Sequence, residues 1–329
     1  MNERPPLVSI GMPVYNGADT LERSVRSLLD QTYRNLEIII FDNGSTDDTQ
    51  EICQRLIQTD PRIRYDRSPV TRGASFSFNQ AFMIATGEYF MWSAVDDLRA
   101  PDDVMIGVGE LEENPAVIAS VPLTIGYIEG ESDPVYSVEA TGLDVADSGI
   151  RRLYTVHTNL PATAIYSVFR SSSLRASGLL RSSIASDVAL LQELAMAGAF
   201  RSNPGQVLHF VRRRNWNTVE QDHSTFTGQV TVPRFFVPGL TLLKDRLARL
   251  WSMDRGIAWK TSVAAMVLLL EARRGIFVRG VRSLRWFIGD RRARLVAIWL
   301  YWRFLHKENY VVFDEKRYIE RMVLRRFGF

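Results

Sequence analysis

The stretch of sequence that decides the fold is Leu36 to Thr46, which reads L-E-I-I-I-F-D-N-G-S-T. Its first six residues are dominated by apolar and β-branched side chains, which predicts a buried strand. An aspartate and a polar turn follow, and apolar Ile52 and Leu56 then recur at helical spacing. The stretch therefore predicts a strand, a tight turn and a helix, the unit from which helix-covered parallel sheets are built.

The same unit recurs on both sides of this stretch. Residues 7–12 predict a short buried strand that stops at Pro13, and Asp19 with Glu22 predicts a capping box at the start of a helix. Further elements are expected downstream, namely strands over residues 63–65 and 88–94 and a helix over residues 74–86. Strands that alternate with helices in this way predict an α/β fold with a mainly parallel sheet flanked by helices.

Polar segments follow three of the expected strands. They comprise residues 13–16, 42–45 and 96–97. Ligands of open α/β sheets bind beyond the carboxyl ends of the strands, so the topology places a binding site where these segments meet. The adjacent carboxylates of Asp96 and Asp97 repel each other unless a cation lies near them, and Mg²⁺ or Mn²⁺ prefers such oxygen ligands.

Each candidate carboxylate also has an ordinary structural interpretation. Asp42 is equally well explained as a turn residue that caps the next helix. Asp96 and Asp97 also fit a solvated loop. Asp187 begins an expected helix over 187–197, where an acidic residue suits the helix dipole. The residue types alone leave these alternatives open.

Composition excludes several classes of protein. The chain has 329 residues, of which 46% are hydrophobic and 23% charged, so it can bury a large core and is not mainly disordered. The first lysine is Lys244, which excludes a P-loop or a pyridoxal-phosphate site from the first two thirds. The single cysteine, Cys53, excludes an internal disulfide framework, and the four histidines lack metal-ligand spacing.

Residues 7–103 resemble the donor-binding half of the family 2 glycosyltransferases, which have the GT-A fold. The matching pieces occur in family order and are V-S-I-G-M-P-V-Y-N (8–16), L-L-D-Q-T-Y (28–33), L-E-I-I-I-F-D-N-G-S-T-D (36–47), Arg72-Gly73, Asn79, T-G-E-Y-F (86–90), D-D-L (96–98) and Pro101-Asp102. A weaker match runs from Ser186-Asp187 to Gly198. The resemblance implies a GT-A domain over residues 1–232, with a donor nucleotide half (1–115) and an acceptor half (116–232).

The resemblance assigns four residues to the nucleotide of the donor. Pro13 and Tyr15 would pack on the base, and Asp42 would accept a hydrogen bond from the ring N–H of uracil or thymine. Arg72 would help to hold the base or a phosphate. The donor implied is a UDP- or dTDP-sugar.

The resemblance assigns three carboxylates to the chemistry. Asp96 and Asp97 would bridge the ribose region and a divalent metal, Mn²⁺ or Mg²⁺, on the diphosphate. Asp187 would be the general base that takes the proton of an acceptor hydroxyl, with inversion at the anomeric carbon. The implied acceptor is a glycan or a lipid-linked molecule, and the implied process is synthesis of bacterial surface polysaccharide or glycoconjugate.

The chain departs from the family pattern at three positions. Ala94 stands where the metal strand often has its first aspartate, Asn43 replaces a frequent second aspartate, and Phe78 stands where an arginine often precedes Asn79. Ala94 motivates a competing hypothesis from another class, a non-catalytic nucleotide-sugar or glycan-binding scaffold. A sugar-1-phosphate nucleotidyltransferase would share the α/β plan, but the Gly- and Lys-containing loop expected after its first strand is missing.

Charge divides the chain into two parts. Residues 1–232 hold 19 arginines and 29 acidic residues, whereas residues 233–329 hold 21 basic and 8 acidic residues. The second part is expected to be a basic amphipathic helical region, with arginines such as 291, 292 and 294 and with five tryptophans at 251, 259, 286, 299 and 302. It suits either an anionic membrane surface or packing against the catalytic domain or a second subunit in a homodimer.

Other partners and locations follow less directly. Nucleic acid is not an expected partner, because no recognised binding module accompanies the basic charge. The basic and aromatic segment 211–216 resembles only loosely the one that closes over the diphosphate in relatives. The N-terminus lacks the pattern of a signal peptide, and the apolar run 261–270 is too short to span a bilayer. The expected location is cytoplasmic, with peripheral attachment to the cytoplasmic face of the membrane as an option.

Overall fold

The structure is a computed structural model that describes residues 4–140, 152–156, 160–183, 185–212, 219–228, 238–269, 296 and 310–312. The expected amphipathic helix around residues 277–288, the arginines at 291–294 and the segment 213–216 lie outside the described residues. The division into a GT-A domain and a C-terminal region therefore stays a prediction.

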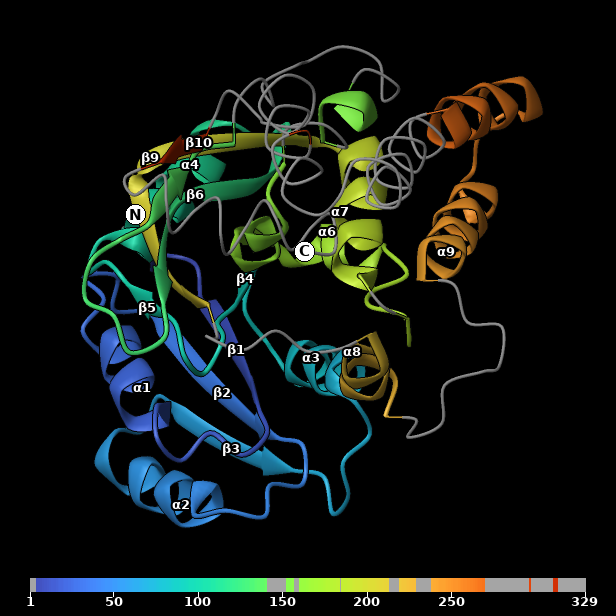
Figure 1. Ribbon diagram of the computed structural model, residues 1–329. Helices are drawn as coiled ribbons and strands as arrows, with labels where there is room; N and C mark the ends of the chain where they lie inside the picture. Colours follow the sequence, from blue (N-terminus) through green and yellow to red (C-terminus); the bar gives the residue numbers. More distant parts are fainter. Residues whose placement is uncertain are drawn as a thin grey trace.

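The first half of the chain forms the predicted parallel sheet with its helices (Figure 1). The elements are β1 (Val8–Val14), α1 (Leu21–Leu29), β2 (Leu36–Asp42), α2 (Thr49–Thr59), β3 (Ile63–Arg67), α3 (Ala74–Met83) and β4 (Tyr89–Trp92). The strands pair in the order β4-β1-β2-β3, all parallel. Because their carboxyl ends share one edge of the sheet, the loops after β1, β2 and β4 meet there.

Strand β2 shows why both faces of this sheet are covered. Ile38 and Ile40 pack in the hydrophobic cluster that holds the buried residues of α1 and α2. Ile39 points to the other cluster, which contains Phe82 of α3. Successive side chains of a strand point to opposite faces, so the unbroken apolar run read from the sequence is explained by burial on both faces.

The predicted capping box at the start of α1 does not form. The helix begins one residue after the expected position, with Thr20 as its N-cap, and no side-chain cap is present. The backbone of Gly17 supplies the turn instead, because its carbonyl accepts hydrogen bonds from the amides of Thr20 and Leu21. The prediction at Asp19 and Glu22 was therefore wrong.

The second half of the chain adds antiparallel strands and further helices. The elements are β5 (Leu98–Arg99), α4 (Asp103–Glu113), β6 (Val117–Ile128), β7 (Tyr136–Val138), the 3₁₀ helix η1 (Ala162–Tyr166), β8 (Val168–Arg170), α6 (Ser171–Arg175), α7 (Ser186–Ala197) and β9 (Ala199–Arg212). Strand β8 runs antiparallel to both β4 and β6, so it joins the two halves into one sheet. The long strand β9 pairs parallel to β6 and antiparallel to β5.

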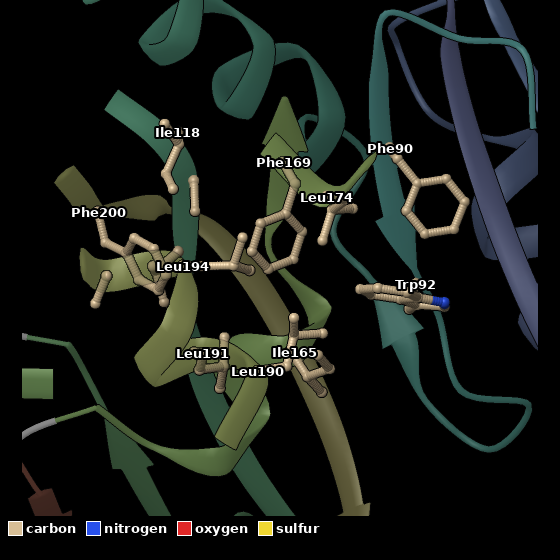
Figure 2. Close-up of a cluster of buried hydrophobic side chains, with 14 of the residues drawn as sticks. Phe90, Trp92, Ile118, Ile165, Phe169, Leu174, Leu190, Leu191, Leu194 and Phe200 are labelled. Atoms are coloured by element: carbon tan, nitrogen blue, oxygen red, sulfur yellow. The ribbon is translucent and has the colours of Figure 1, made fainter. Parts of the chain in front are cut away.

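A single apolar cluster fixes α7 against this second half of the sheet (Figure 2). Leu190, Leu191 and Leu194 of α7 are almost fully buried there, together with Phe169 of β8 and Ile165 of η1. Complete burial of a leucine side chain contributes about 2 kcal/mol. The helix that carries Asp187 is therefore anchored along its length to the sheet and to η1.

The remaining elements come from the C-terminal third and the segment before it. They are α8 (Val219–Thr227), α9 (Pro238–Ser252) and β10 (Tyr310–Val312). Helix α8 lies beside α3, and α9 lies beside α7 (Figure 1). Strand β10 pairs with β7 at the edge of the sheet, so this region contributes a strand as well as helices. In the described part of the chain, no helix combines the length and apolar character needed to cross a membrane.

Candidate active site

Several hydrogen bonds join the loops after β1 and β2. The amide of Asn16 donates to Ser45 Oγ at 2.9 Å, and Asn16 Oδ1 accepts from the amide of Thr46 at 2.8 Å. The amide of Gly17 donates to Thr49 Oγ1 at 2.9 Å, and that of Ala18 donates to an Asp47 carboxylate oxygen at 3.1 Å. This edge of the sheet is therefore a fixed surface.

Asp42 is buried beneath this surface and has three partners. Its Oδ1 accepts a hydrogen bond from the amide of Ser45 at 2.8 Å, and its Oδ2 accepts one from the Tyr65 hydroxyl at 3.0 Å. The Nε of Arg67 forms an ion pair with Oδ2 at 3.0 Å, and the Asp42 side chain has no exposed surface. Burial and the Asp42 charge raise the pKa of Tyr65, which keeps its phenol a donor. Asp42 thus fixes the loop and two neighbouring side chains.

Asn43 connects this loop to the predicted phosphate-binding segment. Its Oδ1 accepts a hydrogen bond from the amide of Arg72 at 3.1 Å, and its Nδ2 donates to the carbonyl of Gly73 at 3.2 Å. An asparagine can donate and accept at once, which an ionised aspartate cannot do. The Arg72 side chain stays exposed, with its guanidinium 4.9 Å from the centre of the Phe76 ring.

The other two residues predicted at the nucleotide base differ in exposure. Pro13 is buried within β1, whereas Tyr15 follows the strand and is 48% exposed. Of these two, Tyr15 alone offers a large exposed face on which a base could stack. Gly17 lies against the loop after β4, because a Cβ atom at position 17 would lie 2.9 Å from a methyl carbon of Val95.

Asp96 and Asp97 follow β4 and differ in their surroundings. Asp96 is partly exposed, whereas Asp97 is 1% exposed. One Asp97 oxygen accepts a hydrogen bond from the amide of Val211 at 2.9 Å, and the other is buried without a partner in the described residues. Burial, followed by the charge of Asp96, raises the pKa of Asp97 to about 8. A cation at this position would remove the cost of the unpaired oxygen.

The predicted base and the two predicted metal ligands all act electrostatically on one tyrosine. The pKa of the Tyr166 phenol is raised well above its ordinary value by burial first, and then by the charges of Asp97, Asp96 and Asp187. Asp187 is the second residue of α7, and burial raises its pKa, opposed by the helix-terminal amides of Val188 and Asp187. The charge of Asp187 in the second half and the charges of the pair after β4 thus act on the same phenol.

Arg99 holds the backbone on either side of this arrangement. Its guanidinium donates to the carbonyl of Tyr166 at 2.7 Å and to that of Trp92 at 3.1 Å. It also forms an ion pair with Asp103 of α4 at 3.0 Å, and both side chains are fully buried. The end of β4, the 3₁₀ helix η1 and α4 thus meet at one arginine, which lies two residues after Asp97.

Sequence reasoning missed Asn43, Arg99 and Tyr166 as parts of the site. Asn43 carried a signal, because it stands where relatives often have an aspartate. Arg99 and Tyr166 carried none, because their roles depend on contacts between segments 67 residues apart. No group of three or more His, Cys, Asp or Glu side chains that could hold a metal ion occurs in the described ranges. The protein would therefore offer two carboxylates, with donor phosphates or water as further ligands.

Comparison with curated proteins points to one family. Relatives include a glycosyltransferase of Haemophilus influenzae that has not been characterised, 38% identical over 125 residues, and the glycosyltransferase GlyG of Streptococcus pneumoniae, 33% identical over 138 residues. These alignments cover 38% and 42% of this chain, and 50% and 45% of the relatives. The chondroitin synthase of Escherichia coli is 35% identical over 145 residues, which cover 42% of this chain and 21% of that protein. The chain thus spans half or less of the length of these relatives.

Solved structures agree on the fold at low sequence identity. TarS 1–349 of S. aureus in complex with UDP-GlcNAc superposes with a TM-score of 0.53 and 16% identity, covering 88% of this chain and 83% of that one. The mannosyltransferase PcManGT of Pyrobaculum calidifontis, in complex with GDP-Man and Mn²⁺, has a TM-score of 0.50 and 17% identity, covering 93% and 82%. The GT-A architecture predicted from the sequence is confirmed.

The model of the family described as glycosyl transferase family 2 matches residues 9–167, which contain β1 to η1 and the loops after β1, β2 and β4. Residues 9–167 of this chain are therefore similar to the glycosyltransferases of family 2.

Proposed function

We propose that this protein transfers a sugar from a UDP- or dTDP-sugar to a hydroxyl group, with inversion at the anomeric carbon. One observation carries the proposal, namely that Asp96 and Asp97, which follow the parallel strand β4, and Asp187, at the start of α7, all act electrostatically on Tyr166. Nucleotide sugars bound to structural neighbours, UDP-GlcNAc in TarS and GDP-Man in PcManGT, support a donor of this class. Tyr15, Arg72 and the Asp42 loop would face the nucleotide.

The proposed reaction is a single displacement. The acceptor oxygen forms a bond to the anomeric carbon while the bond from that carbon to the diphosphate oxygen breaks. The carboxylate of Asp187 takes the proton of the acceptor hydroxyl, and the nucleoside diphosphate leaves with the bonding electron pair. The raised pKa of Asp187 suits a base, because it brings the carboxylate closer to the operating pH. Fixed loops contribute mainly by aligning the two substrates.

The donor set fits a divalent cation of the Mg²⁺ or Mn²⁺ type. Two adjacent carboxylates, one with a buried unpaired oxygen, are the hard oxygen ligands that such ions prefer. Asp97 and Asp96 would hold the ion, which would supply positive charge for the departing diphosphate. Ala94 offers no ligand, so the donor phosphates would complete the shell.

The nature of the acceptor is proposed from relatives. Chondroitin and hyaluronan synthases among them suggest a glycan or a lipid-linked acceptor, and hence a role in bacterial surface polysaccharide or glycoconjugate synthesis. A cytoplasmic location suits a nucleotide-sugar donor.

The C-terminal region offers a surface for attachment to the cytoplasmic face of an anionic membrane. Lys244 and the exposed Trp251 lie on α9, and exposed Leu268 and Leu269 lie in the helical segment described over residues 257–269. Basic and aromatic side chains on adjacent helices suit a lipid interface. Flotation of the intact protein with phosphatidylserine vesicles at low salt is the expected result, and loss of flotation in Trp251→Glu would locate the contact. A concentration-dependent dimer that does not float would instead support a subunit contact.

The test of the proposed function is donor turnover. The intact protein, with Mn²⁺, should release UDP or dTDP from at least one sugar in a panel of nucleotide sugars, and release should increase with the correct acceptor. Asp187→Asn should lower this rate about 1,000-fold without weakening nucleotide binding in calorimetry. Binding without any turnover by the wild type would support the alternative, a non-catalytic scaffold, which Ala94 motivates.

A further inference from the structure

The connection between α6 and α7 leads into the position of Asp187 and has a strained backbone. Two of its non-glycine residues, Leu179 and Ala185, have φ angles of 49° and 57°. Each left-handed residue of this kind costs about 1–2 kcal/mol, so the surrounding structure must hold the connection in this shape. Ala185 is the N-cap of α7, and Asp187 follows two residues later. This connection therefore sets the backbone that leads into Asp187, at the start of α7.

One set of contacts comes from the donor-binding half. Asn79 of α3 donates a hydrogen bond from Nδ2 to the carbonyl of Leu180 at 2.7 Å, and its Oδ1 accepts one from the amide of Leu180 at 3.1 Å. The side chain thus pairs with both backbone groups of one residue, as a neighbouring strand would. This contact fixes one side of the connection.

The second set comes from α9, through a buried arginine. Arg249 is 1% exposed, and its Nη2 donates a hydrogen bond to the carbonyl of Leu179 at 2.6 Å. The bond therefore fixes the backbone next to Leu180, at one of the two strained residues. A buried guanidinium with such a contact has far less freedom than a surface one, because breaking the bond would leave a carbonyl and an N–H group without a partner.

The rest of the guanidinium is fixed by two acidic residues. Its Nη1 pairs with Glu193 of α7, and its Nε lies 3.2 Å from Asp245 of the same helix α9. Glu193 also accepts a hydrogen bond from the amide of Gly178 at 3.0 Å, and Asp245 forms an ion pair with Arg181 at 3.0 Å. Residues 178, 179 and 181 of the connection are thus tied to one network centred on α9 and α7.

We propose that Arg249 is a positioning residue for the proton transfer to Asp187, so that helix α9 of the basic region completes the active site. The inference rests on the proposed function, because it assigns Asp187 the role of base. The competing view is that Arg249 only stabilises the packing of α9 on α7. The two views differ, since a structural role would lower stability without changing the kinetics of the folded protein.

The test compares two arginines that contact the same helix. Arg249→Lys keeps the positive charge between Glu193 and Asp245. A lysine has no planar guanidinium, so it cannot at the same time donate to the carbonyl of Leu179. The matched control is Arg152→Lys, because Arg152 donates to the carbonyl of Ala195 at 2.9 Å, at the far end of α7. Both variants are measured as intact protein, by release of UDP from the donor that the wild type uses best.

The expected result is a kinetic difference between the two variants. Arg249→Lys should lower kcat on the order of 100-fold, because small displacements of a reacting group have effects of this size. The Kd for UDP should stay within about twofold, since the nucleotide loops lie on other elements. The acid limb of the kcat profile should move to lower pH, because a displaced Asp187 is better solvated. Arg152→Lys should retain the kcat of the wild type and the same acid limb of its pH profile.

Other outcomes have defined meanings. If Arg249→Lys folds and keeps the kcat and pH profile of the wild type, the inference is overturned while the proposed function stands. If Arg249→Lys does not fold, Asp245→Asn decides, because it weakens the same network without changing its shape. A lower kcat with unchanged UDP affinity supports the inference, and wild-type kinetics overturn it. A wild-type protein that binds UDP but turns over no donor contradicts the proposed function and, with it, this inference.

Discussion

Carboxylates at this site differ in their partners, and those partners determine what each can do. Asp42 satisfies both oxygens with protein partners, so it stabilises the loop. Asp97 has one oxygen without a partner in the described residues, so its ionised form is costly unless a cation is near. Asp187 lies between these cases, because helix-terminal amides offset part of its burial. Three acidic residues of equal intrinsic pKa thus suit three different tasks.

The first prediction concerns the pH dependence set by Asp187. Burial raises the pKa of this carboxyl, and a general base must be ionised to act. The rate should therefore fall as pH falls through that raised pKa, at a higher pH than for an ordinary aspartate. Measurement of kcat between pH 4 and pH 9 checks this. The residual rate of Asp187→Asn should not show this fall at low pH, whereas Glu113→Gln, an exposed control on α4, should show it. An identical fall in Asp187→Asn would contradict the assignment of Asp187 as the base.

The second prediction concerns Asp97→Asn. The folded-state pKa of Asp97 is about 8, above that of an unfolded aspartate, so the wild type without metal loses stability as pH rises between about 4 and 8. The amide carries no charge, so at pH 9 the variant should be more stable than the metal-free wild type by about 1 kcal/mol or more. Its activity should nevertheless fall about 100-fold, and Mn²⁺ should no longer raise its Tm. Urea unfolding at pH 6 and pH 9 measures the stability, and equal pH dependence in both proteins would refute the prediction.

At the scale of elements, α8 and α3 meet through two glycines. A side chain at Gly73 would begin 2.5 Å from the backbone nitrogen of Gly228, and one at Gly228 would begin 2.6 Å from the carbonyl carbon of Arg72. Both glycines also have positive φ angles, 87° and 73°. Gly73 is the N-cap of α3, and Asn43 holds its carbonyl. The position of α8 is therefore coupled to the segment proposed to face the nucleotide.

The third prediction follows from this contact. Gly73→Ala and Gly228→Ala should each destabilise the protein by about 2 kcal/mol, because the left-handed backbone and the close contact both disfavour a side chain. They should also weaken UDP binding about tenfold, since the Arg72 backbone must move. Gly109→Ala is the control, because Gly109 lies in α4 with open space around it. This substitution should raise the free energy of unfolding by up to about 1 kcal/mol. Thermal unfolding measures the stability, and calorimetry with UDP measures the affinity. Unchanged affinity in both variants would show that α8 is not coupled to the site.

The sequence predicted the elements of the first half well, because β1, β2 and β4 are buried along almost all of their length, and helices with regular spacing follow β1, β2 and β3. Ile38 to Ile40 illustrate this, since a short unbroken run of β-branched apolar residues is typical of a strand that is covered on both faces. Strand β7 is not among the elements expected from the sequence, because its pairing with β6 and β10 depends on contacts between segments that no local pattern shows. The carboxylates were found for the same reason as the strands they follow, whereas Arg99, Tyr166 and Arg249 act through contacts that no local pattern shows.

At the scale of the whole molecule, the first half supplies the nucleotide loops and the second half supplies the base. The two are joined in the sheet by β8 and at the site by Arg99. Arg99 and Asp103 form a fully buried ion pair, and one nitrogen and one oxygen of the pair have no partner in the described residues. Burial raises the pKa of Asp103 in spite of the arginine. Such a pair is a weak source of stability, so its value lies in what else the guanidinium binds.

The fourth prediction separates these two contributions. Arg99→Met should cost about 3–5 kcal/mol, because it leaves the Asp103 carboxylate buried without its partner. The double variant Arg99→Met with Asp103→Leu removes both charges and should recover most of that loss. It should not recover activity, because the carbonyls of Tyr166 and Trp92 still lack their donor, and Tyr166 is then free to shift relative to Asp97 and Asp187.

Urea unfolding and kcat measured on the same four proteins, the wild type, both single variants and the double variant, give this comparison. If stability and activity return together in the double variant, Arg99 serves only to neutralise Asp103, and the two halves are aligned by the sheet alone. If stability returns while kcat stays low, the halves need Arg99 for alignment. The second result is expected. Strand β8 pairs with β4 only at residues 168–170. At Tyr166, which precedes that strand, the contact between the halves is made by Arg99.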